Sequence, residues 1–318
     1  MKRKQYLLIL IFLSIMVVFL PSCDEESRPT FPLSAEIFYS VVGKQVAFTA
    51  LTHSAVNWSW DFGDGNTSNE KNPVHVYEEG GYYLVILTTT DAKGNSLIKE
   101  ARLAVELTPY AMLTGDHTAD DYDGKKWKIS AAHPAGGDYF ANADADLTTI
   151  DPSITPLPTG ALDLYLGYGE VYKDEYIFYH DGRYRMDLKE DGAALSGLVY
   201  QMVTSGGSDI VKMNKMGEEF GLCIARHNPG LDATFTFIEK EDFSVPSVYG
   251  AQGVVTYKNV STLDFSGSEF IGFKDFQKKV IVKSITDTKM QLVLFMAASP
   301  KHLPMNTHAL ILSFEIVN

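Results

Sequence analysis

The segment NWSWDFGDGNTS, residues 57–68, constrains the fold more strongly than any other part of this chain of 318 residues. Large apolar side chains recur at every second position in it and just before it: Val56, Trp58, Trp60 and Phe62. A period of two predicts a β-strand with one buried face. The Gly63-Asp64-Gly65 that follows suits a hairpin turn, because Asp-Gly tolerates positive φ. Similar short patterns recur across residues 34–108, which predicts an immunoglobulin-like β-sandwich there.

Residues 60–65, Trp-Asp-Phe-Gly-Asp-Gly, resemble the signature of the polycystic-kidney-disease (PKD) domain. Further landmarks of that family follow in order: Pro73, His75, Tyr77, Gly81, Tyr82, Asp91 and Gly94. The resemblance implies that Trp60 and Phe62 fill the core of a domain spanning 34–108, and that Asp61 and Asp64 are turn formers. A catalytic pair and a calcium site are the alternatives, but the loop lacks the alternating acids and terminal glutamate of an EF-hand.

The first 33 residues predict export and lipid anchoring. Three basic residues precede an apolar run from residue 6 to residue 20, which is shorter than the roughly 20 residues of a membrane span. Residues 1–22 are therefore predicted to be a signal peptide. The next motif, Leu-Pro-Ser-Cys, resembles a bacterial lipobox, which implies lipidation of Cys23 and a linker over 23–33. An uncleaved anchor, or an ordinary signal with a chance cysteine, is the alternative.

Three acidic residues directly after Cys23 resemble the signal that sends lipoproteins of Bacteroidota to the outer face of the outer membrane. The expected localisation is therefore the cell outer membrane, with the protein exposed at the surface. Residues 1–22 carry three basic and no acidic residues, so the net charge of −13 becomes −16 without them. This charge argues against nucleic acid as a partner, because phosphates are neutralised by Lys and Arg.

Composition predicts well-packed domains without disulfides. The apolar fraction is 45% and the aromatic fraction 12%, which excludes disorder. Lipidation would consume one of the two cysteines, and Cys223 lies in the apolar run FGLCIA. A lone thiol among apolar residues predicts a small core side chain.

Residues 109–318 are again rich in strand patterns, and a larger β-sandwich, jelly-roll-like, is predicted for them. The overall class is all-β. Alternation in ALDLYLGY, residues 161–168, predicts a strand with leucines on one face. The segment DEYIFYHDGRYRMDL predicts a hairpin that turns at His180-Asp181-Gly182. The last strands, on either side of Thr286-Asp287-Thr288, predict a closing meander. Residues 207–222 are the least patterned and are expected to form a loop or a short helix.

This second region resembles the C-terminal domain that follows PKD modules in Bacteroidota surface lipoproteins of polysaccharide-utilisation systems. The resemblance rests on five motifs: Leu113-Thr114-Gly115, Lys125-Lys126-Trp127, Ala132-His133-Pro134, Asp174-Glu175-Tyr176-Ile177-Phe178 and Asp181-Gly182. It implies that the protein binds glycan at the surface, with a lipid anchor in the outer membrane and glycan transporter components as partners. One departure is that no tryptophan follows Trp127, so a sugar platform here would use other aromatic residues.

Sugar rings present apolar C–H faces, which bind flat aromatic rings beside polar groups. Tyr139 and Phe140 are expected in a polar loop, and Tyr165 is expected opposite the leucine face of its strand, next to Asp163. Tyr168 and Tyr172 occupy the place of the tryptophan-rich stretch of relatives. The predicted glycan-binding residues are therefore Tyr139, Phe140, Asp163, Tyr165, Tyr168 and Tyr172.

An acid-rich loop offers a weaker prediction of a structural calcium site. Its candidate ligands are Asp138, Asn142, Asp144 and Asp146, although the loop lacks the glycine of an EF-hand. No other cofactor is predicted. The acids show no arrangement typical of a glycosidase, so the protein is predicted not to be an enzyme. An adhesive surface protein without a glycan ligand, and a polysaccharide hydrolase, remain as alternative functions.

Overall fold

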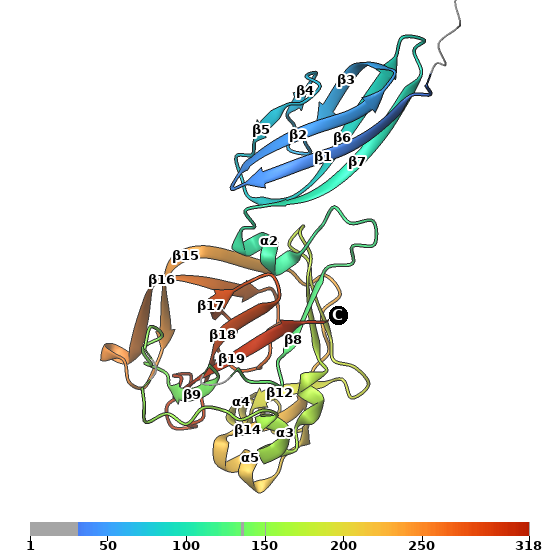
Figure 1. Cartoon of the computed structure of the whole chain (residues 1–318). Helices are drawn as coiled ribbons and strands as arrows, with labels where there is room; N and C mark the ends of the chain where they lie inside the picture. Colours follow the sequence, from blue (N-terminus) through green and yellow to red (C-terminus); the bar gives the residue numbers. More distant parts are fainter. Residues whose placement is uncertain (1–30, 135–136, 150, 318) are drawn as a thin grey trace, which may run out of the picture.

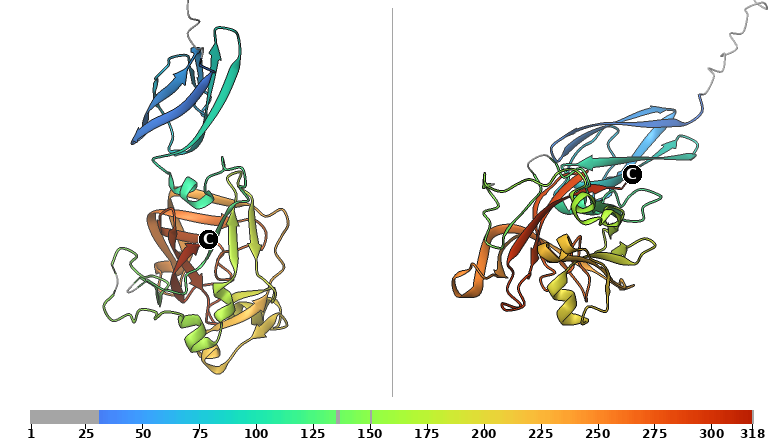
Figure 2. Two further views of the ribbon diagram at one scale, coloured as in Figure 1. Left: turned by 45° about the vertical axis from the view of Figure 1, so that its right-hand side comes forward. Right: turned by 90° about the horizontal axis from the view of Figure 1, so that it is seen from below.

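The computed structural model describes residues 31–134, 137–149 and 151–317. Figure 1 shows two β-rich domains arranged end to end, with the short helix α2 (Pro109–Thr114) at their junction. The left view in Figure 2 shows the same elongated arrangement, and in the right view, seen from below, the two domains overlap. The predicted signal peptide, Cys23 and most of the linker lie outside the described residues.

The N-terminal domain is a sandwich of two antiparallel sheets. Its strands are β1 (Ser34–Val42), β2 (Gln45–His53), β3 (Ala55–Asp61), β4 (Thr67–Ser68), β5 (Val74–Val76), β6 (Gly81–Asp91) and β7 (Ser96–Val105). One sheet has the order β1-β2-β5 and the other β4-β3-β6-β7. Each strand presents alternate side chains to the space between the sheets.

Trp60 is at the centre of that space. Its side chain is fully buried beside Phe48, with ring centroids 5.2 Å apart, and its indole nitrogen donates to the Glu70 carbonyl oxygen at 2.9 Å. Phe62 is also buried. The predicted strand face is therefore correct at these two positions, but Val56, at the outer end of β3, is half exposed.

The C-terminal domain is built around one nine-stranded antiparallel sheet. Its strands are β8 (Lys125–Ile129), β9 (Tyr139–Asn142), β10 (Glu175–Phe178), β11 (Tyr184–Asp187), β15 (Phe235–Pro246), β16 (Val254–Phe265), β17 (Val280–Ile285), β18 (Lys289–Met296) and β19 (His308–Ile316). The order is β11-β10-β8-β19-β18-β17-β16-β15, and β9 also pairs with β19. The strands from β15 to β19 follow one another in sequence order, as the predicted closing meander requires.

The two edges of this sheet meet at one end. Arg183, before β11, forms an antiparallel bridge with Thr234, before β15. The Tyr184 amide donates to the Ala233 carbonyl at 2.8 Å, and the Phe235 amide donates to the Gly182 carbonyl at 3.0 Å. The sheet therefore curls around a core whose largest fully buried members include Trp127, Tyr176, Phe178, Tyr184 and Phe314.

A smaller layer lies at the other end of the curled sheet (Figure 1). It contains the three-stranded sheet β12-β14-β13 (Ala193–Gly197, Leu222–Arg226 and Ile210–Lys212) and the helices α3 (Ala161–Leu166), α4 (Leu198–Thr204) and α5 (Lys215–Phe220). Two 3-10 turns complete the domain: η1 (Gly169–Tyr172) and η2 (Ala251–Gly253). The poorly patterned residues 207–222 thus contain a strand and a short helix. Cys223 is buried in β14, as predicted.

The expected fold class, an immunoglobulin-like sandwich followed by a larger β-sandwich, is confirmed. The predicted strand over 161–168 is wrong, because these residues form α3. Leu162 and Leu166 are buried but Leu164 is 66% exposed, which is the helical spacing of four rather than the strand spacing of two. Within the described ranges, no helix has the length and apolar character needed to cross a membrane.

Polar contacts join the two domains next to α2. The Tyr82 hydroxyl of β6 donates to the Asp287 carboxylate at 3.2 Å, and Lys125 of β8 donates to the same carboxylate at 2.7 Å. Arg102 of β7 donates to the Thr118 carbonyl at 2.8 Å. The β17–β18 turn, predicted at Thr286-Asp287-Thr288, therefore also contacts the N-terminal sandwich.

Replacing Trp60 with alanine leaves a cavity between the two sheets, so we expect the N-terminal domain to lose about 3–5 kcal/mol of its free energy of unfolding. Trp58→Ala is the matched control, because Trp58 is only partly buried, and we expect a smaller loss. Calorimetric unfolding of both variants measures the difference. Equal losses would contradict the central position of Trp60.

Candidate functional site

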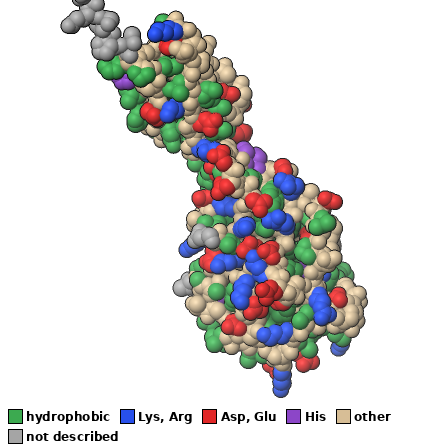
Figure 3. Space-filling view, turned by 90° about the vertical axis from the view of Figure 1, so that its right-hand side faces the viewer, with side chains coloured by type: hydrophobic (Ala, Val, Ile, Leu, Met, Phe, Trp, Pro, Cys, Tyr) green, Lys and Arg blue, Asp and Glu red, His purple; other side chains and the backbone are tan. Residues whose placement is uncertain are grey.

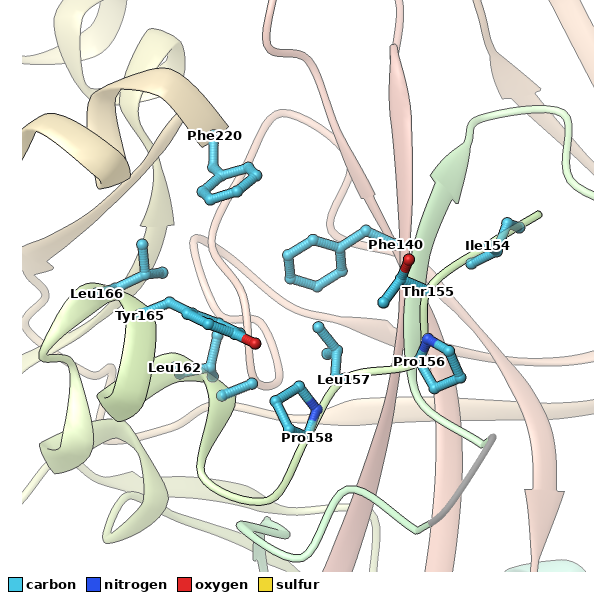
Figure 4. Close-up of a pocket in the computed structure, with 11 residues that line it drawn as sticks. Phe140, Ile154, Thr155, Pro156, Leu157, Pro158, Leu162, Tyr165, Leu166 and Phe220 are labelled. Carbon is cyan, nitrogen blue, oxygen red and sulfur yellow. The ribbon is translucent and has the colours of Figure 1, made fainter. Parts of the chain in front are cut away.

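An open pocket of about 290 Å³ lies between the smaller layer and the large sheet. Three aromatic side chains border it: Phe140 from β9, Tyr165 from α3 and Phe220 from the end of α5. Figure 4 shows these rings on different sides of one space, with Leu157 and Pro158 below them. Tyr165 and Phe220 are each about half exposed, at 49% and 51%. We call this site the aromatic pocket.

Helix α3 presents Tyr165 because of the residues at its ends. Gly160 before it and Gly167 after it both have positive φ, 68° and 69°, which glycine adopts without strain. The Gly167 amide donates to the Asp163 and Leu162 carbonyls, which closes the C-terminus of the helix. Since Leu162 and Leu166 anchor one face in the core, Tyr165 is directed outward to the pocket.

Helix α5 is fixed to α3 by Asn214. The Asn214 side-chain oxygen caps α5 by accepting from the Gly217 amide at 2.7 Å, and its side-chain nitrogen donates to the Leu166 carbonyl at 2.6 Å. Lys212 also donates to the Gly167 carbonyl. These contacts hold Phe220, the last residue of α5, opposite the Tyr165 ring.

The third wall comes from β9 and the loop before α3. In β9, Tyr139 packs in a separate core cluster on the other face of the sheet, whereas Phe140 packs beside Leu157. This separation follows from the strand period of two. The loop is held by the Leu157 amide, which donates to the Asp138 carbonyl at 2.9 Å, and by two prolines, Pro156 and Pro158.

A buried polar network lies beneath the pocket. The Asp138 carboxylate contacts His133 Nδ1 at 2.9 Å, and His133 Nε2 contacts the Tyr172 hydroxyl at 2.7 Å. The Tyr172 oxygen accepts from the Leu162 amide at 2.9 Å. Burial raises the pKa of Tyr172 to about 12, so this hydroxyl is neutral. The network therefore fixes the start of α3.

The structure brings two of the six predicted glycan-binding residues, Phe140 and Tyr165, to one pocket. The prediction that Tyr139 and Tyr168 form a surface platform for sugar is wrong, because both residues are 1% exposed. The Tyr168 hydroxyl donates to the Leu222 carbonyl at 3.2 Å. Tyr172 belongs to the buried network. Asp163 is exposed, but it is two residues from Tyr165 on a helix, so the two side chains point in different directions.

Sequence reasoning missed Phe220 and the loop over residues 154–158. Phe220 is the last residue of a six-residue helix, which is too short for a periodic signal. Prolines at positions 156 and 158 are typical of a loop, but no local pattern places Leu157 beside Phe140. These residues meet Tyr165 only through the tertiary fold.

The predicted calcium ligands do not form one group. Asp138 is fully buried, and its carboxylate accepts from the Ser313 amide and hydroxyl and from Gln291. Asn142, Asp144 and Asp146 border a separate hollow of about 260 Å³. The prediction is therefore wrong for Asp138. Over the part of the chain that the structure describes, no group of three His, Cys, Asp or Glu side chains is placed to hold a metal ion.

The acids of the opening motif are turn formers, as predicted. Asp61 accepts from the Gly63 amide at 2.9 Å, and Asp64 accepts from the Asn66 amide at 3.0 Å and contacts His75 Nε2 at 2.7 Å. Partial burial acts to raise the pKa of Asp64, but the hydrogen bonds from His75 and Asn66 outweigh it and lower the pKa below its ordinary value.

Comparison with known proteins identifies the N-terminal domain. Residues 40–105 match the family described as the PKD domain, so the chain contains a PKD domain. Collagenase ColA of Bacillus cereus is 37% identical over 109 residues, which make up 32% of this chain and 11% of that protein. Collagenase ColQ1 of Bacillus cereus strain Q1 is 51% identical over 51 residues, 16% of this chain and 5% of that protein.

These curated relatives resemble only the PKD part, so the chain spans about a tenth of their length or less. Among solved structures, the PKD1 domain of Vibrio anguillarum Epp is 30% identical, covering 25% of this chain and 99% of that one, with a TM-score of 0.24. A solved structure of carbohydrate-binding modules of promiscuous specificity, from the β-sandwich superfamily, is 13% identical. The match covers 92% of this chain and 94% of that one, with a TM-score of 0.26. These TM-scores are too low to assign a ligand.

We expect Asp64→Asn to destabilise the PKD domain by about 1–2 kcal/mol near pH 7, because an amide replaces a hydrogen-bonded carboxylate. Because folding lowers the pKa of Asp64, its carboxylate stabilises the folded domain at pH values above the unfolded-state pKa. This stabilisation is lost as the pH falls through the folded-state pKa. The difference in free energy of unfolding between Asp64→Asn and wild type is therefore expected to shrink below about pH 4. Urea unfolding at several pH values measures it. Loss of ligand retention with unchanged unfolding would instead place a binding site in this loop.

Proposed function

We propose that this chain is a surface lipoprotein that binds glycan through the aromatic pocket of its C-terminal domain. The observation that carries the proposal is the convergence of Phe140, Tyr165 and Phe220 on one open pocket. Three segments far apart in the sequence supply these rings, and two of the rings are half exposed to solvent.

The chemistry of the pocket suits a neutral sugar ring. Aromatic faces bury the apolar C–H face of a pyranose, while the hydroxyls of Tyr165 and Thr155, visible in Figure 4, can hydrogen-bond the ring hydroxyls. The net charge of −13 favours a neutral or cationic glycan over a polyanionic one. The helix caps and the buried network hold the rings before a ligand arrives, which reduces the entropy cost of binding.

Anchoring at Cys23 is the second part of the proposal. The lipobox and the acids after it support attachment to the outer face of the outer membrane. The PKD domain would then act as a spacer between lipid and glycan pocket. Glycan transporter components in the same membrane are the proposed protein partners.

A protein ligand is the second candidate. Apart from Thr155 and Tyr165, all residues that border the aromatic pocket are apolar, and two of them are prolines. Such a wall also suits an apolar side chain of a protein, which would make the chain an adhesive surface protein. Screening the chain in parallel against a glycan array and a peptide array separates the two candidates.

Replacing Tyr165 and Phe220 together with alanine removes two exposed rings, so we expect at least tenfold weaker glycan retention, about 1.4 kcal/mol. Leu164→Ala is the matched control, because Leu164 lies on the same helix, is 66% exposed and does not border the pocket. Affinity gel electrophoresis measures retention, and thermal unfolding checks folding. Unchanged retention in a folded double variant would place the glycan site elsewhere.

We expect Cys23→Ala to abolish labelling by a palmitate analogue and to move the protein from the membrane fraction to the soluble fraction. Cys223→Ala is the control, because Cys223 is buried and burial raises the pKa of its thiol to about 12, so labelling is expected to persist. Fractionation of a bacterial host that lipidates exported proteins provides the measurement. A Cys23→Ala variant that stays labelled and membrane-bound would refute the anchor.

A further inference from the structure

A second hollow adjoins the aromatic pocket, and we call it the polar hollow. It has a volume of about 260 Å³, and its walls come from β9 and the loop that follows β9. Polar side chains border it, among them Asn142, Asp146 and Thr149. Ile154 borders both this hollow and the aromatic pocket. The two spaces are therefore neighbours, separated by one partly buried side chain.

The two spaces meet around the outer edge of β9. Among the described strands, β9 pairs only with β19, so no strand covers its other edge. Phe140 and Tyr139 lie on opposite faces of β9, and each borders a different space. Figure 4 shows Phe140 and Ile154 on either side of this strand. A ligand that occupies both spaces must therefore follow a curved path past Ile154.

Neither space alone has the volume of a typical small-molecule site. Such sites have about 300–1,000 Å³, whereas the aromatic pocket has about 290 Å³ and the polar hollow about 260 Å³. Taken together, the two fall within this range. A single sugar ring would fill only one of them, so their combined shape suits a ligand of several linked rings.

An exposed aromatic ring lies beside the polar hollow. Tyr249, in the turn between β15 and η2, is 46% exposed, and its hydroxyl donates to the side-chain oxygen of Asn142 at 3.0 Å. Buried Ser247 fixes this turn: its amide donates to the Gly253 carbonyl at 2.9 Å, and its hydroxyl accepts from the Tyr249 amide at 3.2 Å. The ring is therefore held in place with its hydroxyl already paired, and its face is left for a ligand.

A buried hydroxyl of the polar hollow lacks a partner. Tyr139 is 1% exposed and borders the hollow, and its hydroxyl makes no hydrogen bond to any described residue. Burial raises the pKa of Tyr139, and the charge of Asp146, on the wall of the same hollow, raises it further. The hydroxyl therefore lies toward Asp146, at the floor of the hollow. A ligand hydroxyl that enters the hollow would supply the missing partner.

The wall of the polar hollow is ordered by its own hydrogen bonds and carries negative charge. Asp146 accepts from the Thr148 amide at 2.8 Å and from the Thr149 hydroxyl at 2.7 Å, and Asp151 accepts from the Ser153 amide at 2.8 Å. Acidic and basic side chains are interspersed elsewhere on this domain, as Figure 3 shows for one face. By contrast, the described residues that border the hollow include no lysine or arginine. The hollow therefore disfavours an anionic sugar unit.

We propose that the glycan ligand is a neutral oligosaccharide that spans both spaces, with one sugar unit against Tyr165 and Phe220 and another against Tyr249. This inference rests on the proposed function of the aromatic pocket and adds the length of the ligand to it. In each space an aromatic ring binds the apolar C–H face of a sugar, and in the polar hollow the carboxylates accept from sugar hydroxyls. Because a short ligand reaches only one space, affinity is expected to rise with chain length.

Isothermal titration of the full chain tests the inference, with malto-, cello-, manno- and xylo-oligosaccharides, each from the disaccharide to the hexasaccharide. In a series that binds, we expect the hexasaccharide to bind at least about tenfold more tightly than the disaccharide. Tyr249→Ala is expected to abolish this length preference and to leave the disaccharide affinity unchanged. Tyr249→Phe keeps the ring and is expected to keep the preference. Tyr39→Ala is the matched control, because Tyr39 in β1 is also 46% exposed but lies in the PKD domain.

The double variant of Tyr165 and Phe220 separates this inference from the proposed function. It is expected to weaken binding of both the disaccharide and the hexasaccharide, and unchanged binding of both would refute the aromatic pocket. Equal affinity along a series that binds, or an unchanged length preference in a folded Tyr249→Ala variant, would overturn the extension alone. An equal loss of preference in Tyr249→Phe and Tyr249→Ala would refute contact with the ring. If none of the series binds, both proposals fail.

Discussion

The buried carboxylate of Asp138 holds together the elements that build the aromatic pocket. It accepts hydrogen bonds from Gln291 in β18 and from the amide and hydroxyl of Ser313 in β19, and it contacts His133. A buried charge is costly unless its hydrogen bonds are complete. These hydrogen bonds therefore connect β18 and β19 to the residue that precedes β9. His133 extends this constraint through Tyr172 to the first turn of α3.

The aromatic pocket supplies the binding chemistry proposed for the C-terminal domain. The aromatic pocket has exposed rings, few polar groups and walls fixed by helix caps, so it suits the apolar face of a ligand. Helix α3 and the loop over residues 154–158 border this pocket.

The PKD domain contributes position rather than binding chemistry in this scheme. The β1 strand starts at the end of the sandwich away from the C-terminal domain, and β7 ends at the junction (Figure 1). Contacts of Tyr82 with Asp287 and of Arg102 with Thr118 fix the junction. A strand of nine residues spans roughly 30 Å. If Cys23 is lipidated, the sandwich therefore separates the aromatic pocket from the membrane surface by about that distance.

The sequence by itself determined the PKD domain, the all-β class and the hairpins, because these depend on local patterns: Trp60 and Phe62 alternate along a strand, and Asp64-Gly65 closes a turn. The sequence predicted Tyr165 as a ligand-binding residue from its neighbours, but the strand predicted around it is a helix. A six-residue segment with apolar residues at positions 162, 164 and 166 fits both the strand period of two and the helical spacing of four. The glycines at 160 and 167 and the core contacts of Leu162 and Leu166 favour the helix. Only the tertiary structure placed Phe220 opposite Tyr165 and joined His133 to Tyr172. Both depend on contacts between segments far apart in the chain, and no local pattern records such contacts.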